Sequence, residues 1–288
     1  MSDGENDPYD LDSGPDPAAF AAAAPEASVG ELDGDGEGTE TTETTETTEN
    51  TETTENTDTP VYAVGVGPGN PEYLTPRGRR AIREADVVVG FETVVEFVAD
   101  ETDADLLTCG YADEADALAE FGRRVAAGDR GTAVLMGDPN HSGYQFLGKV
   151  QRAVERPVRV IPGISSLQIA ASRARTPMED TRFVTLHKSG SLDADLDRLA
   201  AAVGERHLLV LPRPFDWMPG DIAEFLVESG ADPSLDALVL ERLTHDDERI
   251  TRTTLGDLRD SAGGSGPDST PYSDLSVLAV RAPVDAAD

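Results

Sequence analysis

The sequence is short of the residues that build several common classes of protein. Its 288 residues include a single cysteine, Cys109, which excludes an intramolecular disulfide framework and a metal site made of several cysteines. No stretch approaches the roughly 18 consecutive apolar residues of a membrane-spanning helix. The apolar run 18–24 has no basic region before it, so we expect no signal peptide and a cytoplasmic location.

Positive charge is equally scarce. The chain has 23 basic residues against 56 acidic ones, a net charge of −33, and only two lysines, Lys149 and Lys188. Such a chain repels nucleic acids and anionic membranes unless its bases gather in one patch, and the densest cluster, 77–83, is short and followed by acids. We therefore expect neither as a partner. The composition resembles proteins of cells that accumulate molar salt, where a Debye length of about 3 Å screens self-repulsion. An ordinary acidic protein is the alternative.

The negative charge is concentrated at the N-terminus. Residues 1–59 contain 18 acids and no lysine or arginine, and 39–59 nearly repeat Thr-Thr-Glu. A segment with so few apolar side chains and such strong repulsion does not offset the entropy of ordering. The sequence therefore predicts a disordered acidic tail over 1–59. The remainder still carries 38 acids against 23 bases.

Beyond the tail, short apolar runs alternate with segments of helical periodicity. The first half is expected to form strands at 61–64, 87–90, 132–136 and 158–161, and helices at 77–85, 92–99, 114–127, 144–155 and 165–175. The second half is expected to form strands at 183–187, 207–211, 237–243 and 276–280, and helices at 223–229 and 255–259. This alternation predicts an α/β protein with two α/β domains, 60–179 and 180–283, and an active site in the cleft between them.

The first turn that could carry chemistry follows the first strand and reads Gly-Val-Gly-Pro-Gly-Asn over 65–70. A dinucleotide fingerprint would require a glycine in place of Asn70, and Pro68 prevents a helix from starting directly beneath a phosphate. Taken alone, the motif favours a tight turn that lets the backbone pass close to a neighbour.

Two further turns follow predicted strands. In 136–143, Asp138 either orients a cofactor or starts a turn before a proline, and the turn is favoured. His141 has no second histidine or cysteine at ligand spacing, so no metal site is expected. In 161–166, Ser165 and Ser166 either cap the next helix or donate to a ligand. The pattern is not Gly-x-Ser-x-Gly, so no nucleophile elbow is expected.

Together, in this order, the three turns resemble the tetrapyrrole methylase family. The motifs that carry the resemblance are 64–69, 137–139 and 162–166, followed by 241–244, 247–250 and 254–258, and the similarity covers 61–280. Within the family, 182–187 and 273–278 are most similar to the precorrin-7 C5-methyltransferases of cobalamin biosynthesis, here in a haloarchaeal type.

The resemblance implies a homodimer that transfers a methyl group from S-adenosylmethionine to a ring carbon of a tetrapyrrole. The residues that it implies at the donor site are Pro68, Gly137, Asp138, His141, Ser165, Ser166, Pro212 and Leu243. Displacement at a sulfonium methyl requires alignment more than a nucleophilic side chain or a metal. No catalytic residue is assigned, although His141 and His187 either take part in proton transfer or line the cleft.

The implied substrate, a precorrin or cobalt-precorrin, carries many carboxylates and requires local positive charge. The candidate contacts are Arg173, Arg175, Arg182 and Arg213. A separate protein would supply C15 methylation and decarboxylation, because the chain is too short for that additional domain. The alternatives are another acceptor, such as a different precorrin carbon, uroporphyrinogen or a diphthamide precursor, and a non-catalytic nucleotide-binding module.

Overall fold

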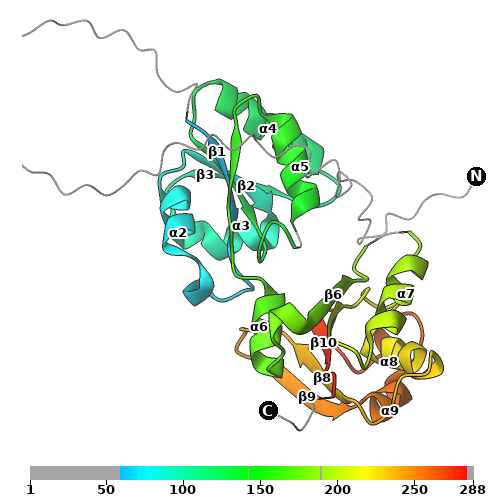
Figure 1. The fold of residues 1–288 in the computed structure, drawn as a ribbon. Coiled ribbons are helices and arrows are strands. Elements are labelled where there is room, and N and C mark those ends of the chain that lie inside the picture. The colour runs from blue at the N-terminus through cyan, green and yellow to red at the C-terminus, as the bar shows by residue number, and fades with distance from the viewer. Residues whose placement is uncertain (1–58, 142, 189, 284–288) are drawn as a thin grey trace, which may run out of the picture.

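The structure, a computed structural model, describes residues 59–283 except Ser142 and Ser189. It contains two five-stranded sheets with helices packed against them, which confirms the predicted α/β class (Figure 1). The tail predicted over 1–59 lies outside the described residues, apart from Thr59. Among the residues described, no helix combines the length and apolar character needed to cross a membrane.

The first sheet is entirely parallel and has the strand order β3-β2-β4-β1-β5. Its strands are β1 (Val61–Gly65), β2 (Val87–Phe91), β3 (Asp105–Cys109), β4 (Gly131–Leu135) and β5 (Val158–Ile161). Its helices are α2 (Pro76–Arg83), α3 (Glu92–Val98), α4 (Glu114–Ala126) and α5 (Tyr144–Ala153). The buried side chains of α4 and α5 cover one face, and those of α2 and α3 cover the other. Burial on both faces explains why the inner strands are continuous apolar runs.

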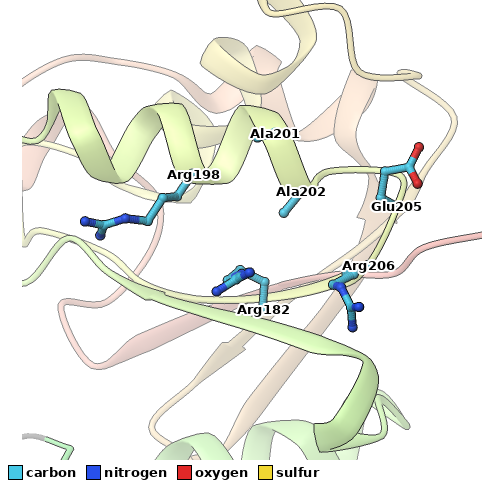
Figure 2. Close-up of a pocket in the computed structure, with 6 residues that line it drawn as sticks. All are labelled: Arg182, Arg198, Ala201, Ala202, Glu205 and Arg206. Atoms are coloured by element: carbon cyan, nitrogen blue, oxygen red, sulfur yellow. The ribbon is translucent and has the colours of Figure 1, made fainter.

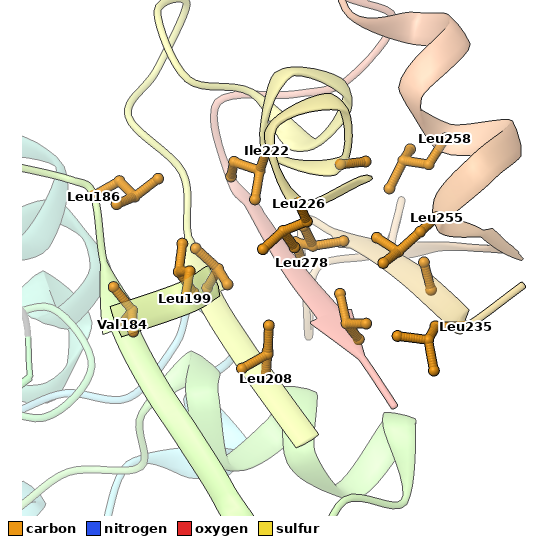
Figure 3. Packing of buried hydrophobic residues seen from close by; sticks show 14 of the residues in the cluster. Val184, Leu186, Leu199, Leu208, Ile222, Leu226, Leu235, Leu255, Leu258 and Leu278 are labelled. Atoms are coloured by element: carbon orange, nitrogen blue, oxygen red, sulfur yellow. The ribbon is translucent and has the colours of Figure 1, made fainter. Parts of the chain in front are cut away.

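The second sheet is mixed and has the order β6-β7-β10-β8-β9, with only β6 and β7 parallel to each other as neighbours. Its strands are β6 (Thr181–Thr185), β7 (His207–Leu211), β8 (Asp236–Glu241), β9 (Arg249–Thr254) and β10 (Ser276–Val280). One face packs against α7 (Asp193–Ala202), α8 (Pro219–Glu228) and α9 (Leu255–Leu258), as Figure 3 shows. Short 3₁₀ turns lie at Pro71–Tyr73, Ala99–Glu101, Met178–Asp180, Arg259–Ser261 and Pro267–Ser269. Strands β3 and β9 and helix α7 are not among the elements that the sequence predicts.

Helix α6 (Ser166–Ala174) covers the other face of the second sheet. Its buried side chains, among them Leu167 and Ala170, form one apolar cluster with residues of β7, β8 and β10. Tyr73 and Ile164, which lie in the segments that follow β1 and β5 of the first sheet, pack against the same cluster. The domain limits 60–179 and 180–283 stay predictions, and α6 packs on the second sheet although it precedes the predicted limit.

The two lysines of the chain both pair with carboxylates that are withdrawn from solvent. Lys149 forms an ion pair with Glu114, whose side chain is 8% exposed, and Lys188 pairs with Asp195, whose side chain is 4% exposed. Removing the cation of such a pair leaves an uncompensated buried charge, which strongly destabilises the fold. Both lysines therefore have a structural role in a chain whose remaining basic residues are arginines.

Candidate active site

Three loops that follow strands of the first sheet meet backbone to backbone. The Gly67 N–H donates to the Gly137 carbonyl at 3.3 Å, and the Gly137 N–H donates to the Gly67 carbonyl at 2.8 Å. A Cβ atom on Gly65 would lie 2.6 Å from both the Gly137 oxygen and the Gly163 nitrogen, and one on Gly163 would collide with the Gly137 oxygen. The tight turn with a close backbone neighbour is thus confirmed, and the neighbour is the backbone of the other two loops.

Asp138 joins the second loop to the third. Its side chain is buried, and its Oδ2 atom accepts a hydrogen bond from the Gly163 N–H at 3.1 Å. Its Oδ1 atom accepts from the backbone and side-chain nitrogens of Asn140 at 2.8 and 3.1 Å. Both oxygens therefore hold the loops in place, as the turn interpretation required. A contact of Asp138 with the methyl donor stays a prediction.

Ser165 caps helix α6. Its buried hydroxyl accepts a hydrogen bond from the Leu167 N–H at 3.2 Å, and its own N–H donates to the Gln168 Oε1 atom at 2.8 Å. This reciprocal arrangement satisfies backbone donors at the start of the helix. Ser166 is the first helical residue and is half-buried, and its hydroxyl has no hydrogen-bond partner among the described residues. Of the two serines, Ser166 is therefore the one whose side chain is available to a ligand.

His141 connects the second loop to the second sheet. Its ring meets the ring of Phe183 on β6 edge to face, with centroids 6.0 Å apart. The Nδ1 atom is buried 3.6 Å from the Asp138 Oδ1 atom and has no hydrogen-bond partner among the described residues. Buried polar atoms usually have a hydrogen-bond partner, so this nitrogen is a candidate contact for a ligand.

The loop after β8 makes a second connection between the two sheets. The Thr244 carbonyl accepts a hydrogen bond from Asn70 Nδ2 at 3.3 Å, and the ring of His245 lies against Gly69, where a Cβ atom would collide with it. Arg242 and Thr244 have φ angles of +48° and +71°. Left-handed backbone at residues other than glycine is costly and concentrates at functional sites. Leu243, between them, is 5% exposed and anchors the loop in the core beside α6.

The remaining candidate residues follow β6 or β7, at the edge of the second sheet where β8 also ends. Strands β7 and β8 are both antiparallel to β10, so they point in the same direction, and β6 is parallel to β7. Pro212, which is buried, follows β7. Arg213 donates to the Gly190 carbonyl at 2.8 Å and pairs with Asp216 at 3.0 Å, so it joins the loops after β6 and β7.

His187 follows β6 at this edge. Its side chain is exposed, yet the surrounding protein desolvates the imidazole and lowers its pKa, while the carboxylate of Asp274 acts in the opposite direction. The lowered pKa favours the neutral imidazole, which is able to accept a proton.

The structure does not bring the four candidate arginines together. Arg173 pairs with Glu248 at 2.8 Å, and Glu248 also accepts from the Thr244 N–H at 2.8 Å, so Arg173 supports the loop after β8. Arg175 ends helix α6 with a φ angle of +56°. Arg182 lies on the α7 face of the second sheet, as Figure 2 shows, and is therefore separated from His141 and Phe183.

The junction of the two sheets offers neutral polar groups to a ligand. A Cβ atom added to Gly137 would have only the Ser165 Cα atom near it, at 3.9 Å, so space is open beside this turn. The His141 Nδ1 and Thr244 Oγ1 atoms are buried without partners within the described part of the chain. No group of three or more His, Cys, Asp or Glu residues able to hold a metal occurs among the described residues. These features fit a small polar organic molecule such as S-adenosylmethionine.

Residues 60–259 match the family model of the tetrapyrrole (corrin/porphyrin) methylases. The chain therefore belongs to the tetrapyrrole methylase family. Members of this family are C-methyltransferases that use S-adenosylmethionine as methyl donor. The family membership that the three turns and the three later motifs indicated is thus confirmed.

Among curated relatives, the chain is 32% identical over 201 residues to a probable cobalt-precorrin-7 C(5)-methyltransferase of Methanocaldococcus jannaschii, covering 69% of this chain and 90% of the relative. It is 29% identical over 217 residues to a siroheme synthase of Gluconacetobacter diazotrophicus, of which it spans only 45%. The fold matches a uroporphyrin-III C-methyl transferase from Thermus thermophilus, solved with S-adenosyl homocysteine, with a TM-score of 0.58 at 24% identity, covering 77% of this chain and 92% of that one.

Proposed function

We propose that this methylase transfers a methyl group to C5 of precorrin-7 or cobalt-precorrin-7 in cobalamin biosynthesis. The observation that carries the proposal is the similarity to the archaeal relative, which extends over 90% of that protein. The siroheme synthases are similar over less than half of their length.

The methyl donor is proposed to bind at the junction of the two sheets. Ligands of open α/β sheets bind beyond the carboxyl ends of the strands, where the three glycine turns meet. Gly137, Ser166 and His141 are the groups on the first-sheet side with open space or an unpartnered polar atom. Pro212 and Leu243 lie at the facing edge of the second sheet, and Pro68 borders the first turn.

The chain's own residues have two tasks in this reaction. S-adenosylmethionine supplies a sulfonium methyl group that a ring carbon of the tetrapyrrole attacks, leaving S-adenosylhomocysteine. Asp138 and Ser165 hold the loops rigidly, so that the donor and the acceptor are kept in line. His187, neutral because its pKa is lowered, is the group proposed to accept the proton that the ring releases.

The assembly around this site is also proposed. We expect a homodimer in the cytoplasm and a separate protein for C15 methylation and decarboxylation. Sedimentation of the full chain in high salt tests the dimer, and a mass of one chain would exclude it.

The acceptor is tested by mass spectrometry of the full chain with S-adenosylmethionine and either cobalt-precorrin-7 or uroporphyrinogen III. We expect a gain of one methyl group on cobalt-precorrin-7 and no change in uroporphyrinogen III. Methylation of uroporphyrinogen III alone would contradict the proposed acceptor, although it would leave the methylase class intact.

A further inference from the structure

The side chain of Asn70, in the turn after β1, makes two hydrogen bonds of opposite kinds. Its Oδ1 atom accepts from the Glu72 N–H at 2.9 Å and so caps the 3₁₀ turn Pro71–Tyr73. Its Nδ2 atom donates to the Thr244 carbonyl at 3.3 Å, in the loop after β8 of the second sheet. The first bond requires an oxygen and the second requires an N–H group, so an aspartate would make the first bond but not the second.

Thr244, which accepts the second bond, is held from two directions. Its φ angle is +71°, in the left-handed region that a β-branched residue seldom adopts. Its N–H donates to the Glu248 Oε2 atom at 2.8 Å, and Glu248 is paired with Arg173 of α6. Strained backbone of this kind persists where the surrounding structure imposes it. Glu248 acts from the second sheet, and Asn70 acts from the first.

The hydroxyl is the part of Thr244 that the protein does not use. Its Oγ1 atom is buried and has no hydrogen-bond partner within the described ranges. Leu243, beside it, anchors the loop in the core next to α6. Buried polar atoms usually have a partner, so this hydroxyl is a candidate contact for a ligand at the junction. The backbone conformation of Thr244 decides where the hydroxyl points.

A steric contact lies beside the Asn70 bond. The ring of His245 lies so close to Gly69 that a Cβ atom there would be 2.4 Å from the His245 Nε2 atom. Such a contact limits how closely the two loops approach each other, but it does not orient a peptide group. A hydrogen bond is directional, so the bond from Asn70 is the contact that orients the Thr244 carbonyl from the first sheet.

We propose that Asn70 is a positioning residue for the methyl donor. From the first sheet it holds Thr244 of the second sheet in its left-handed conformation, in which the Thr244 hydroxyl is presented to the donor. This inference rests on the proposed donor site at the junction, and it requires no contact between Asn70 and the donor. Without the Asn70 bond, the loop after β8 should lose this conformation while both sheets stay folded.

The test is calorimetric titration of full-chain Asn70→Asp with S-adenosylhomocysteine in high salt. This variant keeps the acceptor for the Glu72 N–H and replaces the donor to the Thr244 carbonyl with a second oxygen. We expect affinity to fall about tenfold, as for the loss of one hydrogen bond, with an unchanged melting temperature. Gln151→Glu is the matched control, because it makes the same change of an amide to a carboxylate near the end of α5 that is remote from the junction. It should bind normally.

A second variant separates positioning from a merely structural role. Thr244→Gly removes the hydroxyl, and glycine adopts a positive φ angle without strain. We expect Thr244→Gly to weaken binding, and Asn70→Asp to cause little further loss when it is added to Thr244→Gly, because the hydroxyl that Asn70 positions is already absent. Independent, multiplying losses in the double variant would overturn the proposal, as would unchanged affinity in Asn70→Asp.

The outcomes distinguish this inference from the proposals on which it rests. Absence of S-adenosylhomocysteine binding to the unmodified chain would overturn both the donor site and the role of Asn70. Normal binding by the unmodified chain and by Asn70→Asp would overturn the role of Asn70 alone. Methylation of an acceptor other than precorrin-7 would contradict the proposed acceptor, and the effect of Asn70→Asp on donor affinity would still be expected.

Discussion

The two sheets of this protein differ in how they hold their loops. In the first sheet, all strands are parallel, and the loops of the junction touch through glycine backbones and the two oxygens of Asp138. In the second sheet, strand directions are mixed, and the facing loop is held by the Arg173–Glu248 ion pair and a left-handed backbone at Thr244. The first arrangement rests on close backbone contacts, whereas the second depends on an ion pair between two side chains. We therefore expect substitutions in the loops of the first sheet to disturb the proposed donor site more than substitutions in the facing loop do.

The largest expected effect compares the two buried lysine pairs. Lys149→Met leaves Glu114 buried and unpaired, so we expect a loss of about 3–5 kcal/mol in the free energy of unfolding. Lys188→Met should cost less, because Arg198 still pairs with Asp195. Urea denaturation measures both. Equal losses would show that Arg198 does not compensate the charge of Asp195 when Lys188 is absent.

A smaller effect is expected where the three glycine turns meet. Gly163→Ala places a methyl group against the Gly137 carbonyl, and overpacking of this kind costs about 1–3 kcal/mol. Because the loops must separate, S-adenosylhomocysteine binding should also be lost. Gly110→Ala is the control, since its nearest neighbour would be an Asp113 oxygen at an ordinary 3.5 Å. Normal binding by Gly163→Ala would refute the role of the close backbone contact.

The third comparison concerns Asp138 and Glu248, the acidic residues that hold the loops on the two sides of the junction. Asp138→Asn removes one of the two acceptor oxygens that tie the loops, so we expect S-adenosylhomocysteine affinity to fall about tenfold, equivalent to one buried hydrogen bond to a charged group. Glu248→Gln keeps an acceptor for the Thr244 N–H and should have a weaker effect. Calorimetry measures both affinities, and a larger loss in Glu248→Gln would reverse our assignment of rigidity to the first sheet.

A weak pH effect is expected from the pair of Asp86 and Arg130, which lie directly before β2 and β4. The hydrogen bonds from Arg130 lower the pKa of Asp86 to about 2, below that of an unfolded aspartate. The pair therefore stabilises the fold at neutral pH, and its contribution is lost as the pH falls from about 4 towards 2. Since both side chains are substantially exposed, we expect Asp86→Asn to cost under about 1 kcal/mol at pH 7, and this cost to disappear as the pH falls through about 2. A constant difference across this range would contradict the assignment.

The smallest expected effect concerns Cys109. Burial, with a further contribution from Glu114, raises the pKa of its thiol to about 12, so the reactive thiolate is rare at ordinary pH. The folded protein should not react with a maleimide at pH 8, whereas the urea-unfolded chain should react fully. Rapid labelling of the folded protein would show that β3, the edge strand that ends at Cys109, separates from the first sheet.

Sequence alone predicted the strands that are buried on both faces, because a continuous apolar run such as that of β4 is the direct signature of such burial. It missed β3 and β9, which are edge strands with exposed polar positions, and α7, whose apolar residues are mostly alanines with only two leucines among three aspartates. These elements depend on pairing and packing with distant parts of the chain.

The candidate site was predicted in part for the same reason. The glycine turns and the helix cap at Ser165 are local features, so short sequence motifs were sufficient to predict them. The contacts of Asn70 with Thr244 and of His141 with Phe183 join residues far apart in sequence, and no local pattern indicates them. Arg182 was grouped with the substrate arginines because sequence does not indicate which face of the sheet it occupies.

The central claim is that the junction of the two sheets binds the methyl donor. Calorimetric titration of the full chain with S-adenosylhomocysteine in high salt tests it most directly, with Gly163→Ala and Arg182→Ala measured beside it. We predict one saturable site per chain, lost in Gly163→Ala and retained in Arg182→Ala. Absence of binding to the folded chain, or loss of binding in Arg182→Ala with binding retained in Gly163→Ala, would contradict the claim.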